Sequence, residues 1–135
     1  MVCIYCDSPT KVSNSRPQKR RYQVWRRRTC TRCGATFSTL ETVDFSTGIV
    51  IRGKDGTLSP FSRDRLFVSI LQAVGHRRDG LSDASGLTTT IASQLLRSTE
   101  TALIESSQIT KTAAIALKRF DSAAAVQYVA YHKQP

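Results

Sequence analysis

Cys3-Ile4-Tyr5-Cys6 opens the chain, and Cys30-Thr31-Arg32-Cys33 repeats its spacing after 23 intervening residues. These two pairs contain all four cysteines of the chain. Each Cys-x-x-Cys pair places two thiolates on one tight turn, so two pairs can surround a single ion at about 2.3 Å. The spacing predicts a structural zinc site with Cys3, Cys6, Cys30 and Cys33 as ligands. Four thiolates complete the coordination, so we expect the ion to stabilise the fold without doing chemistry. A redox dithiol and an iron–sulfur cluster are the alternatives for the same residues.

Positive charge is concentrated around these cysteines. The 135 residues include 20 Lys and Arg against 10 Asp and Glu, which gives a formal net charge of +10. Residues 1–33 contain nine of the basic residues and one acidic residue, so this segment alone carries +8. Such a charge favours a polyanionic partner, either nucleic acid or an anionic lipid surface. The polyanion is therefore expected to bind the N-terminal segment.

The sequence indicates a cytoplasmic protein without a membrane partner. No stretch approaches the roughly 20 apolar residues that span a bilayer. The first nine residues reach a cysteine pair and a proline before the apolar part of a signal peptide can form. Clustered cysteines of this kind are also typical of metal sites in a reducing compartment.

Two strands are predicted beside the second cysteine pair, over residues 21–28 and 36–45. Alternate side chains of a strand point to opposite faces, so one face of residues 21–28 can contact nucleic acid while the other borders solvent or the zinc site. Arg26, Arg27 and Arg28 offer guanidinium groups to phosphates or guanine edges. Trp25 either stacks on a base or fills the interior of the ribbon. The alternative is a basic face that only meets solvent.

The residues after the first 46 change to a different pattern. Residues 49–52 predict a strand that pairs with residues 57–58 across Lys54-Asp55-Gly56, because Asp-Gly favours a hairpin turn. Helical spacing follows Pro60. We expect four helices: one capped by Ser62 and ended by Gly75, one from about Asp83 or Ser85 past Leu95, one capped by Ser106 or Ser107 and ending near Phe120, and one capped by Asp121 and ending near Tyr131. The predicted fold is α+β, with a β-type zinc ribbon at 1–46 joined to a hairpin-and-helix domain at 47–135.

The sequence offers no catalytic constellation. It contains two histidines, His76 and His132, which are expected at an exposed helix end and in a frayed C-terminal tail. No triad pattern, no Walker lysine loop and no catalytic carboxylate is evident. A nucleotide hydrolase is therefore the least favoured class, and we do not expect an enzyme.

Several motifs occur in a characteristic order. In the first part they are Cys3–Cys6, Lys11-Val12-Ser13-Asn14-Ser15-Arg16, Arg26-Arg27-Arg28-Thr29-Cys30 and Phe37-Ser38-Thr39-Leu40-Glu41; in the second part they are Val50–Gly56, Pro60–Leu66 and Leu117–Asp121. The first set resembles the zinc ribbon of the NrdR family of bacterial transcriptional repressors. The second set is similar to the ATP-cone domain that follows the ribbon in that family.

The resemblance implies a repressor of ribonucleotide reductase genes whose ribbon binds paired operator boxes. The cone of that family binds ATP or dATP and sets the oligomeric state, so a homo-oligomer is expected. The predicted DNA-binding residues are Lys11, Arg16, Arg26, Arg27, Arg28 and Arg32. The predicted nucleotide-binding residues are Val50, Ile51, Arg52, Lys54, Arg65 and Leu66. The charges of Arg52, Lys54 and Arg65 suit a triphosphate at a hairpin and a helix start.

The chain departs from the family pattern at several places. Asn14, Trp25 and Ser59 stand where the family has Asp, a fourth arginine and Glu, and Ala125 and Gln127 stand where it has an aromatic residue and an arginine. One additional residue between Ile51 and Asp55 leaves the phosphate-binding role open between Arg52 and Lys54. The alternative function is a zinc-ribbon nucleic-acid-binding adaptor whose C-terminal domain mediates protein interactions without sensing a nucleotide.

Overall fold

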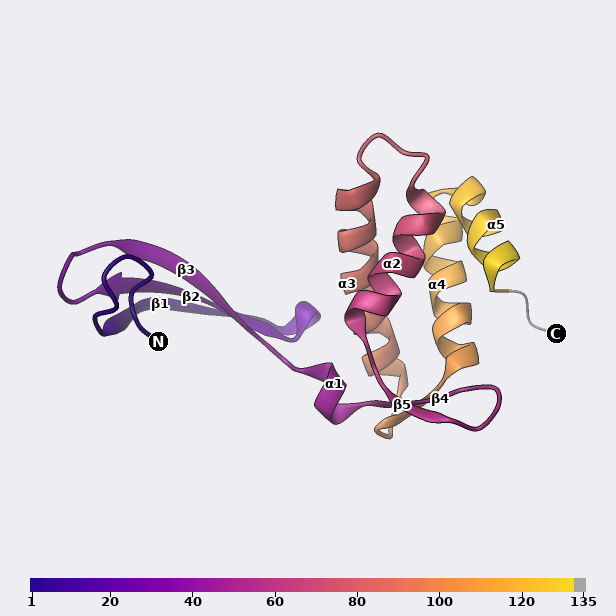
Figure 1. The fold of residues 1–135 in the computed structure, drawn as a ribbon, viewed down its shortest axis with the longest axis horizontal. Helices are drawn as coiled ribbons and strands as arrows, with labels where there is room; N and C mark the ends of the chain where they lie inside the picture. Colours follow the sequence, from indigo (N-terminus) through magenta and orange to yellow (C-terminus); the bar gives the residue numbers. More distant parts are fainter. Residues whose placement is uncertain (133–135) are drawn as a thin grey trace. The chain divides into compact units, whose positions relative to one another are not determined.

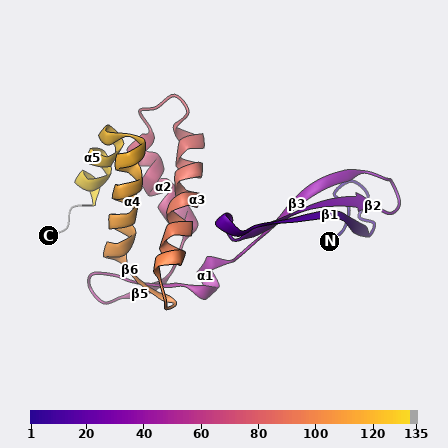
Figure 2. The ribbon, with the colours of Figure 1, turned by 180° about the vertical axis from the view of Figure 1, so that it is seen from behind.

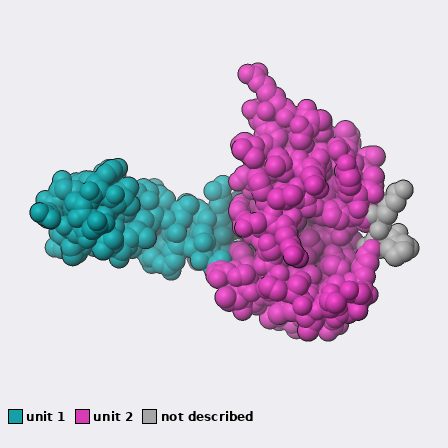
Figure 3. All heavy atoms as spheres, viewed as in Figure 1, with its two compact units in different colours: residues 1–43 teal, residues 44–135 magenta. Residues whose placement is uncertain are grey.

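The chain folds into two units, Met1–Val43 and Asp44–Pro135, which Figure 3 colours separately. The computed structural model describes residues 1–132. Strands form the first unit and helices dominate the second, so the expected α+β class is confirmed. None of the helices in this described part of the chain combines the length and the apolar character that a membrane crossing needs.

The first unit is a three-stranded antiparallel sheet in the order β1-β2-β3 (Figure 1). The strands are β1 (Thr10–Gln18), β2 (Gln23–Cys30) and β3 (Thr36–Thr42). Sequence patterning missed β1, whose residues are almost all polar. The prediction of a strand to residue 45 was wrong, because Asp44 caps a short helix, α1 (Phe45–Gly48), through its carboxylate and the Ser46 N–H at 3.0 Å.

The second unit contains a small sheet in the order β5-β4-β6. The predicted hairpin is present as β4 (Val50–Arg52) and β5 (Leu58–Pro60), and its turn uses a left-handed glycine, Gly56, with φ 82°. The third strand, β6 (Leu103–Glu105), pairs in parallel with β4. Sequence reasoning missed β6, because three residues carry too little periodicity to be recognised.

Four longer helices complete the second unit, as expected. They are α2 (Arg63–Val74), α3 (Gly80–Ser98), α4 (Ser106–Phe120) and α5 (Ser122–Tyr131). Figures 1 and 2 show these helices from opposite sides with the small sheet at one end of them. α2 packs against α3 and α5, and α4 packs against the same two helices.

Two helix starts differ from the prediction. α3 begins at Gly80, before Asp83, because the turn after α2 is very tight: a side chain at Gly80 would lie 2.7 Å from the Val74 carbonyl oxygen. The cap of α4 is Glu105 and not a serine, and the Gln108 side chain accepts a 2.8 Å hydrogen bond from the Glu105 N–H.

Buried apolar side chains are distributed very unevenly between the two units. The largest fully buried ones include Ile70, Ile91 and Leu117, all in the second unit. Within the described residues, the first unit contributes only Cys3 and Cys30 to the buried apolar set. The first unit therefore lacks a hydrophobic core that could stabilise it alone.

Asp121 joins α4 to α5 through several polar contacts. Its carboxylate accepts hydrogen bonds from the backbone N–H groups of Ala123 and Ala124 at 2.9 and 3.2 Å, which confirms the predicted cap. It also forms an ion pair with Arg77 at 2.9 Å and lies 3.3 Å from the Nε2 of the exposed His76. The Ala124 N–H and then the Arg77 guanidinium lower the pKa of Asp121 to about 2.

This lowered pKa predicts an acid-sensitive contribution to the stability of the helices. The folded state favours the charged carboxylate, so the contribution is present above the ordinary Asp pKa of about 3.9 and is lost as the pH falls through about 2. Asp121→Asn removes the charge and keeps a good cap residue. In urea titrations followed by helical circular dichroism, the wild type should be more stable than Asp121→Asn near neutral pH. A difference that stays constant between about pH 5 and about pH 2 would contradict this role.

Candidate functional site

The four cysteine sulfurs of the first unit lie together, within 4.8 Å of one another. The Sγ atoms of Cys3 and Cys33 are 3.7 Å apart, and those of Cys6 and Cys30 are 3.5 Å apart. A tetrahedral zinc ion with sulfur distances of about 2.3 Å requires sulfurs about 3.8 Å from each other. The donor set therefore fits zinc after shifts of no more than about 1 Å between sulfurs, and these thiolates would close its coordination.

Local backbone structure holds the sulfurs in place. In the first knuckle, the Cys3 N–H donates to the Ser8 carbonyl at 2.8 Å. In the second, the N–H groups of Arg32 and Cys33 lie 3.3 and 3.4 Å from the Cys30 Sγ. The Cys33 N–H makes the largest contribution to lowering the pKa of Cys30 to about 6. These backbone contacts favour the thiolate form of Cys30, whereas the pKa of Cys33 in the same knuckle is raised to about 11.

Strand register divides the predicted DNA-binding cations between the two faces of the sheet. Directly opposed residues of antiparallel strands share a face, and Lys11 pairs with Thr29, Asn14 with Arg27 and Arg16 with Trp25. We call the face that carries Lys11, Asn14, Arg16, Trp25 and Arg27 the open face. Lys11, Arg16 and Arg27 are exposed and, within residues 1–132, form no side-chain hydrogen bond or ion pair.

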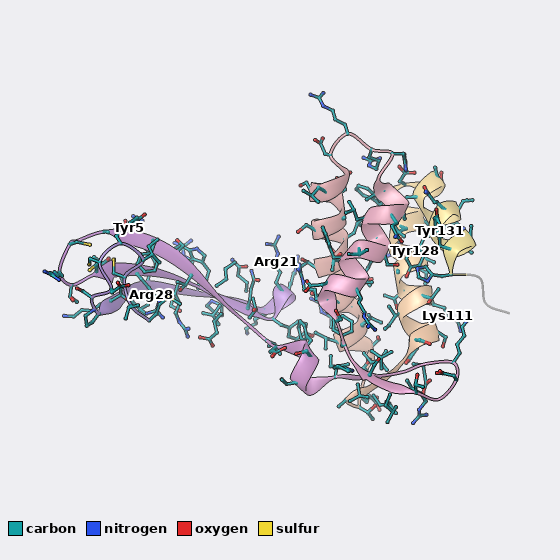
Figure 4. The ribbon with its side chains drawn as sticks, in the orientation of Figure 1. Tyr5, Arg21, Arg28, Lys111, Tyr128 and Tyr131 are labelled. Carbon is teal, nitrogen blue, oxygen red and sulfur yellow. The ribbon has the colours of Figure 1, made fainter. Side chains whose placement is uncertain are left out.

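The opposite face contains Arg26 and Arg28, which are half-buried and bind side chains of the neighbouring strand β3. Arg26 forms an ion pair with Glu41 on β3. Arg28 lies at the cysteine end of the sheet (Figure 4) and donates to the Thr39 hydroxyl at 3.3 Å. Arg32 is exposed between Cys30 and Cys33. The three consecutive arginines therefore do not form one surface.

A pocket of about 380 Å³ in the second unit is formed by the β4–β5 hairpin, the first halves of α2 and α4, and the end of α5. It brings together three of the predicted nucleotide-binding residues, Ile51, Arg65 and Leu66. Its other lining residues are Ser59, Pro60, Phe61, Ser62, Ser69, Ser106, Ile109, Thr110, Tyr128 and His132. Apolar side chains, hydroxyl groups and one guanidinium thus meet at two helix N-termini, which suits a ligand with a flat ring and an anionic group.

The other three predicted residues lie outside this lining. Val50 and Arg52 belong to the opposite face of β4, and Arg52 pairs with Glu105 at 3.1 Å. Lys54 is in the hairpin turn, yet its charge acts on the pocket: burial first, and then Lys54, lowers the pKa of His132.

His132 was expected in a frayed tail, and this prediction was wrong. Its Nε2 lies 2.7 Å from the Ser69 Oγ on α2, and its ring lies 4.4 Å from the ring of Tyr128. Tyr128 is buried and labelled in Figure 4, where it lies on the side of α5 that faces α2. The spacing of four residues between Tyr128 and His132 is a local sign of a shared helix face. The contact with Ser69, 63 residues away, has no signal in the sequence.

Comparison with protein families identifies both units. Residues 1–41 match the N-terminal domain of NrdR-like transcriptional repressors, a zinc ribbon, and residues 49–134 match the ATP cone domain. The two matches support zinc and a nucleotide as the expected cofactors, and four clustered cysteines are present for the metal.

Curated relatives extend over almost the entire chain. The transcriptional repressor NrdR of Exiguobacterium sp. is 35% identical over 135 residues, which cover 99% of this chain and 86% of the relative. That of Symbiobacterium thermophilum is 32% identical over 134 residues, covering 99% and 88%. That of Neisseria meningitidis is 37% identical over 142 residues, covering 99% and 86%. These relatives are regulators and not enzymes, in agreement with the lack of a catalytic constellation in the sequence.

Proposed function

The chain belongs to the NrdR family of transcriptional repressors, and we propose that it represses ribonucleotide reductase genes by binding operator DNA under the control of ATP or dATP. In this proposal residues 1–46 are the DNA-binding domain, and residues 47–135 are the nucleotide-binding and oligomerisation domain. The pocket that gathers Ile51, Arg65 and Leu66 is the observation that carries the nucleotide-dependent part.

The proposed DNA contact is made by the open face of the ribbon. Zinc held by Cys3, Cys6, Cys30 and Cys33 fixes both knuckles, so the sheet is ordered before it meets DNA. Lys11, Arg16 and Arg27 are then available for phosphates, since no side chain of the described residues neutralises them. Arg26 and Arg28 stabilise the sheet from its other face, and Arg32 adds charge at the knuckle.

The proposed nucleotide lies with its phosphates toward Arg65. This residue is in the first turn of α2, where the helix dipole also favours an anion. Lys54 adds positive charge from the hairpin. The apolar side chains of Ile51, Leu66 and Ile109 offer a surface for the base, while hydroxyl groups on α2 and α4 can bond the sugar or phosphate oxygens.

Occupation of the pocket would link elements that are far apart in sequence. The hairpin, α2, α4 and α5 all line it, so a ligand favours one packing of these elements. We propose that this packing determines how copies of the chain assemble. Assembly affects repression because a single small ribbon buries little DNA surface, whereas two linked ribbons bind paired boxes with a high effective concentration.

Arg65→Ala tests the nucleotide site, with Arg63→Ala as the matched control. Arg63 is on the same helix, donates to Thr89 at 2.9 Å and does not line the pocket. Loss of one charge-assisted contact should weaken ATP and dATP binding about 10- to 100-fold in titration calorimetry. Arg63→Ala should bind nucleotide like the wild type.

The apparent molecular mass of the same proteins in solution should be measured with and without dATP. Their binding to a promoter fragment of a ribonucleotide reductase operon should be measured under the same two conditions. A nucleotide-dependent change in assembly and DNA affinity, lost in Arg65→Ala, supports the proposal. If the wild type gives no heat with either nucleotide and its assembly does not change, the chain is instead an adaptor without nucleotide sensing.

A further inference from the structure

Three consecutive cations form the turn between β1 and β2, at the end of the sheet remote from the cysteines. Lys19–Arg21 form a single 3₁₀ turn, and all three residues are exposed. Strand register places this turn beyond the Gln18–Gln23 pair, whereas the Thr10–Cys30 pair marks the metal end. Figure 4 labels Arg21 at one end of the sheet and Arg28 at the other. We call Lys19–Arg21 the basic tip.

The basic tip has a defined backbone structure. Tyr22 adopts a left-handed conformation with φ 52°, and its N–H donates to the Lys19 carbonyl at 3.4 Å. Gln23 donates a side-chain hydrogen bond to Gln18 across the base of the turn. The strand expected over residues 21–28 instead begins at Gln23 and ends at Cys30. The turn before Gln23 separates the cations of the tip from those of the open face.

The geometry of the turn favours phosphates over base edges as the partner. A 3₁₀ helix has three residues per turn, so successive side chains project about 120° apart. Three cations spread in this way cannot all reach into one base pair, but they can surround a phosphate backbone. Reading of a base edge instead needs a side chain aimed along the plane of the base.

The length of β2 matches the width of a DNA groove. Gln23, at the base of the tip, and Arg27, on the open face, are four positions apart, which is about 13 Å along a strand. The major groove of B-DNA is about 12 Å wide and admits a β-ribbon. With Arg27 at the phosphates of one edge of the groove, the tip reaches the phosphates of the other edge, and Arg16, which pairs with Trp25, lies between them.

We propose that the basic tip is a second DNA contact, which binds backbone phosphates across the groove from Arg27 and does not read sequence. This inference rests on the proposed DNA binding by the ribbon. It assigns to Lys19, Arg20 and Arg21 part of the affinity and none of the operator preference.

The test compares three triple variants that each remove three positive charges. The tip variant is Lys19→Gln, Arg20→Gln and Arg21→Gln, and the open-face variant is Lys11→Gln, Arg16→Gln and Arg27→Gln. The control, Arg78→Gln, Lys118→Gln and Arg119→Gln, changes exposed cations of the second unit. Binding to the promoter fragment and to a random duplex of about 30 base pairs, roughly three helical turns, is measured over a range of salt concentrations. Zinc content and circular dichroism confirm that each variant is folded.

For each ribbon bound to the duplex, the tip variant should reduce the slope of log affinity against log salt by about 2.7 relative to the control, the value for three phosphates at about 0.9 each. It should weaken binding to both duplexes by the same factor. A reduction smaller than about 0.9, less than one phosphate, overturns the inference, and so does a loss confined to the promoter fragment. If the open-face variant also behaves like the control, the proposed DNA binding by the ribbon fails as well.

Discussion

Cys30→Ser is expected to unfold the N-terminal unit and abolish DNA binding while the helices of the second unit remain folded. Cys30 is 3% exposed and lies where β2 enters the second knuckle. Its sulfur accepts the N–H groups of Arg32 and Cys33, and it supplies one of the four donors of the metal site. A serine hydroxyl keeps its proton at neutral pH and is a poor zinc ligand.

The expected effect is large because the first unit has little else to stabilise it. Apart from Cys3 and Cys30, none of its described residues belongs to the buried apolar set. Domains of this size usually need a metal or disulfides, and structural zinc sites contribute about 10–16 kcal/mol to folding. Loss of zinc should therefore unfold the three strands together and destroy the open face, which β1 and β2 form.

Zinc content, the amide spectrum of residues 1–43 by NMR, and DNA affinity measure this result. Cys33→His is the matched control, since Cys33 is exposed and an imidazole can replace a thiolate at zinc. It should keep one equivalent of zinc and much of the DNA affinity. A metal-free Cys30→Ser protein with an ordered, DNA-binding ribbon would show that zinc is dispensable.

Local patterns were sufficient to predict the metal site but not to divide its basic surroundings into functional surfaces. The spacing of the four cysteines predicts their geometry, because each Cys-x-x-Cys turn is built from residues close together in the sequence. Which residues share a face of the sheet depends instead on how the strands pair. The sequence did not predict β1, which shifts register between Val12 and Asn14, so only the paired strands show that Lys11 and Arg16 share a face with Arg27.

The pocket of the second unit was even less predictable from the sequence, because it is formed by elements that are far apart in the chain. The Asp-Gly turn and the helix caps Ser62 and Asp121 were predictable, since each is a local hydrogen-bonding or backbone preference. The contact between Ser69 and His132 depends on how α2 meets α5, which single-sequence periodicity does not encode. Likewise, Arg52 matches the motif but pairs with Glu105 from β6, a strand that the sequence did not reveal.

Leu117→Ala is expected to destabilise the second unit strongly while the ribbon keeps its zinc and its fold. Leu117 is completely buried in α4, among the side chains of a core confined to the second unit. Truncation to alanine leaves a cavity, and buried Leu→Ala changes cost about 3–5 kcal/mol. Because domains are typically stable by about 5–15 kcal/mol, a loss of this size removes a large part of the stability of the unit.

Ile115→Ala is the matched control for Leu117→Ala. It lies two residues away on the same helix, but its side chain is 55% exposed, so its truncation should change stability by less than about 0.5 kcal/mol. Urea unfolding followed by helical circular dichroism reports on the second unit, because the first unit contains no α-helix. Zinc content and the NMR spectrum of residues 1–43 report on the ribbon at the same time. If Leu117→Ala released zinc in parallel with helix unfolding, the two units would fold as one. If it matched Ile115→Ala in stability, the core around Leu117 would be able to close over the missing side chain without cost.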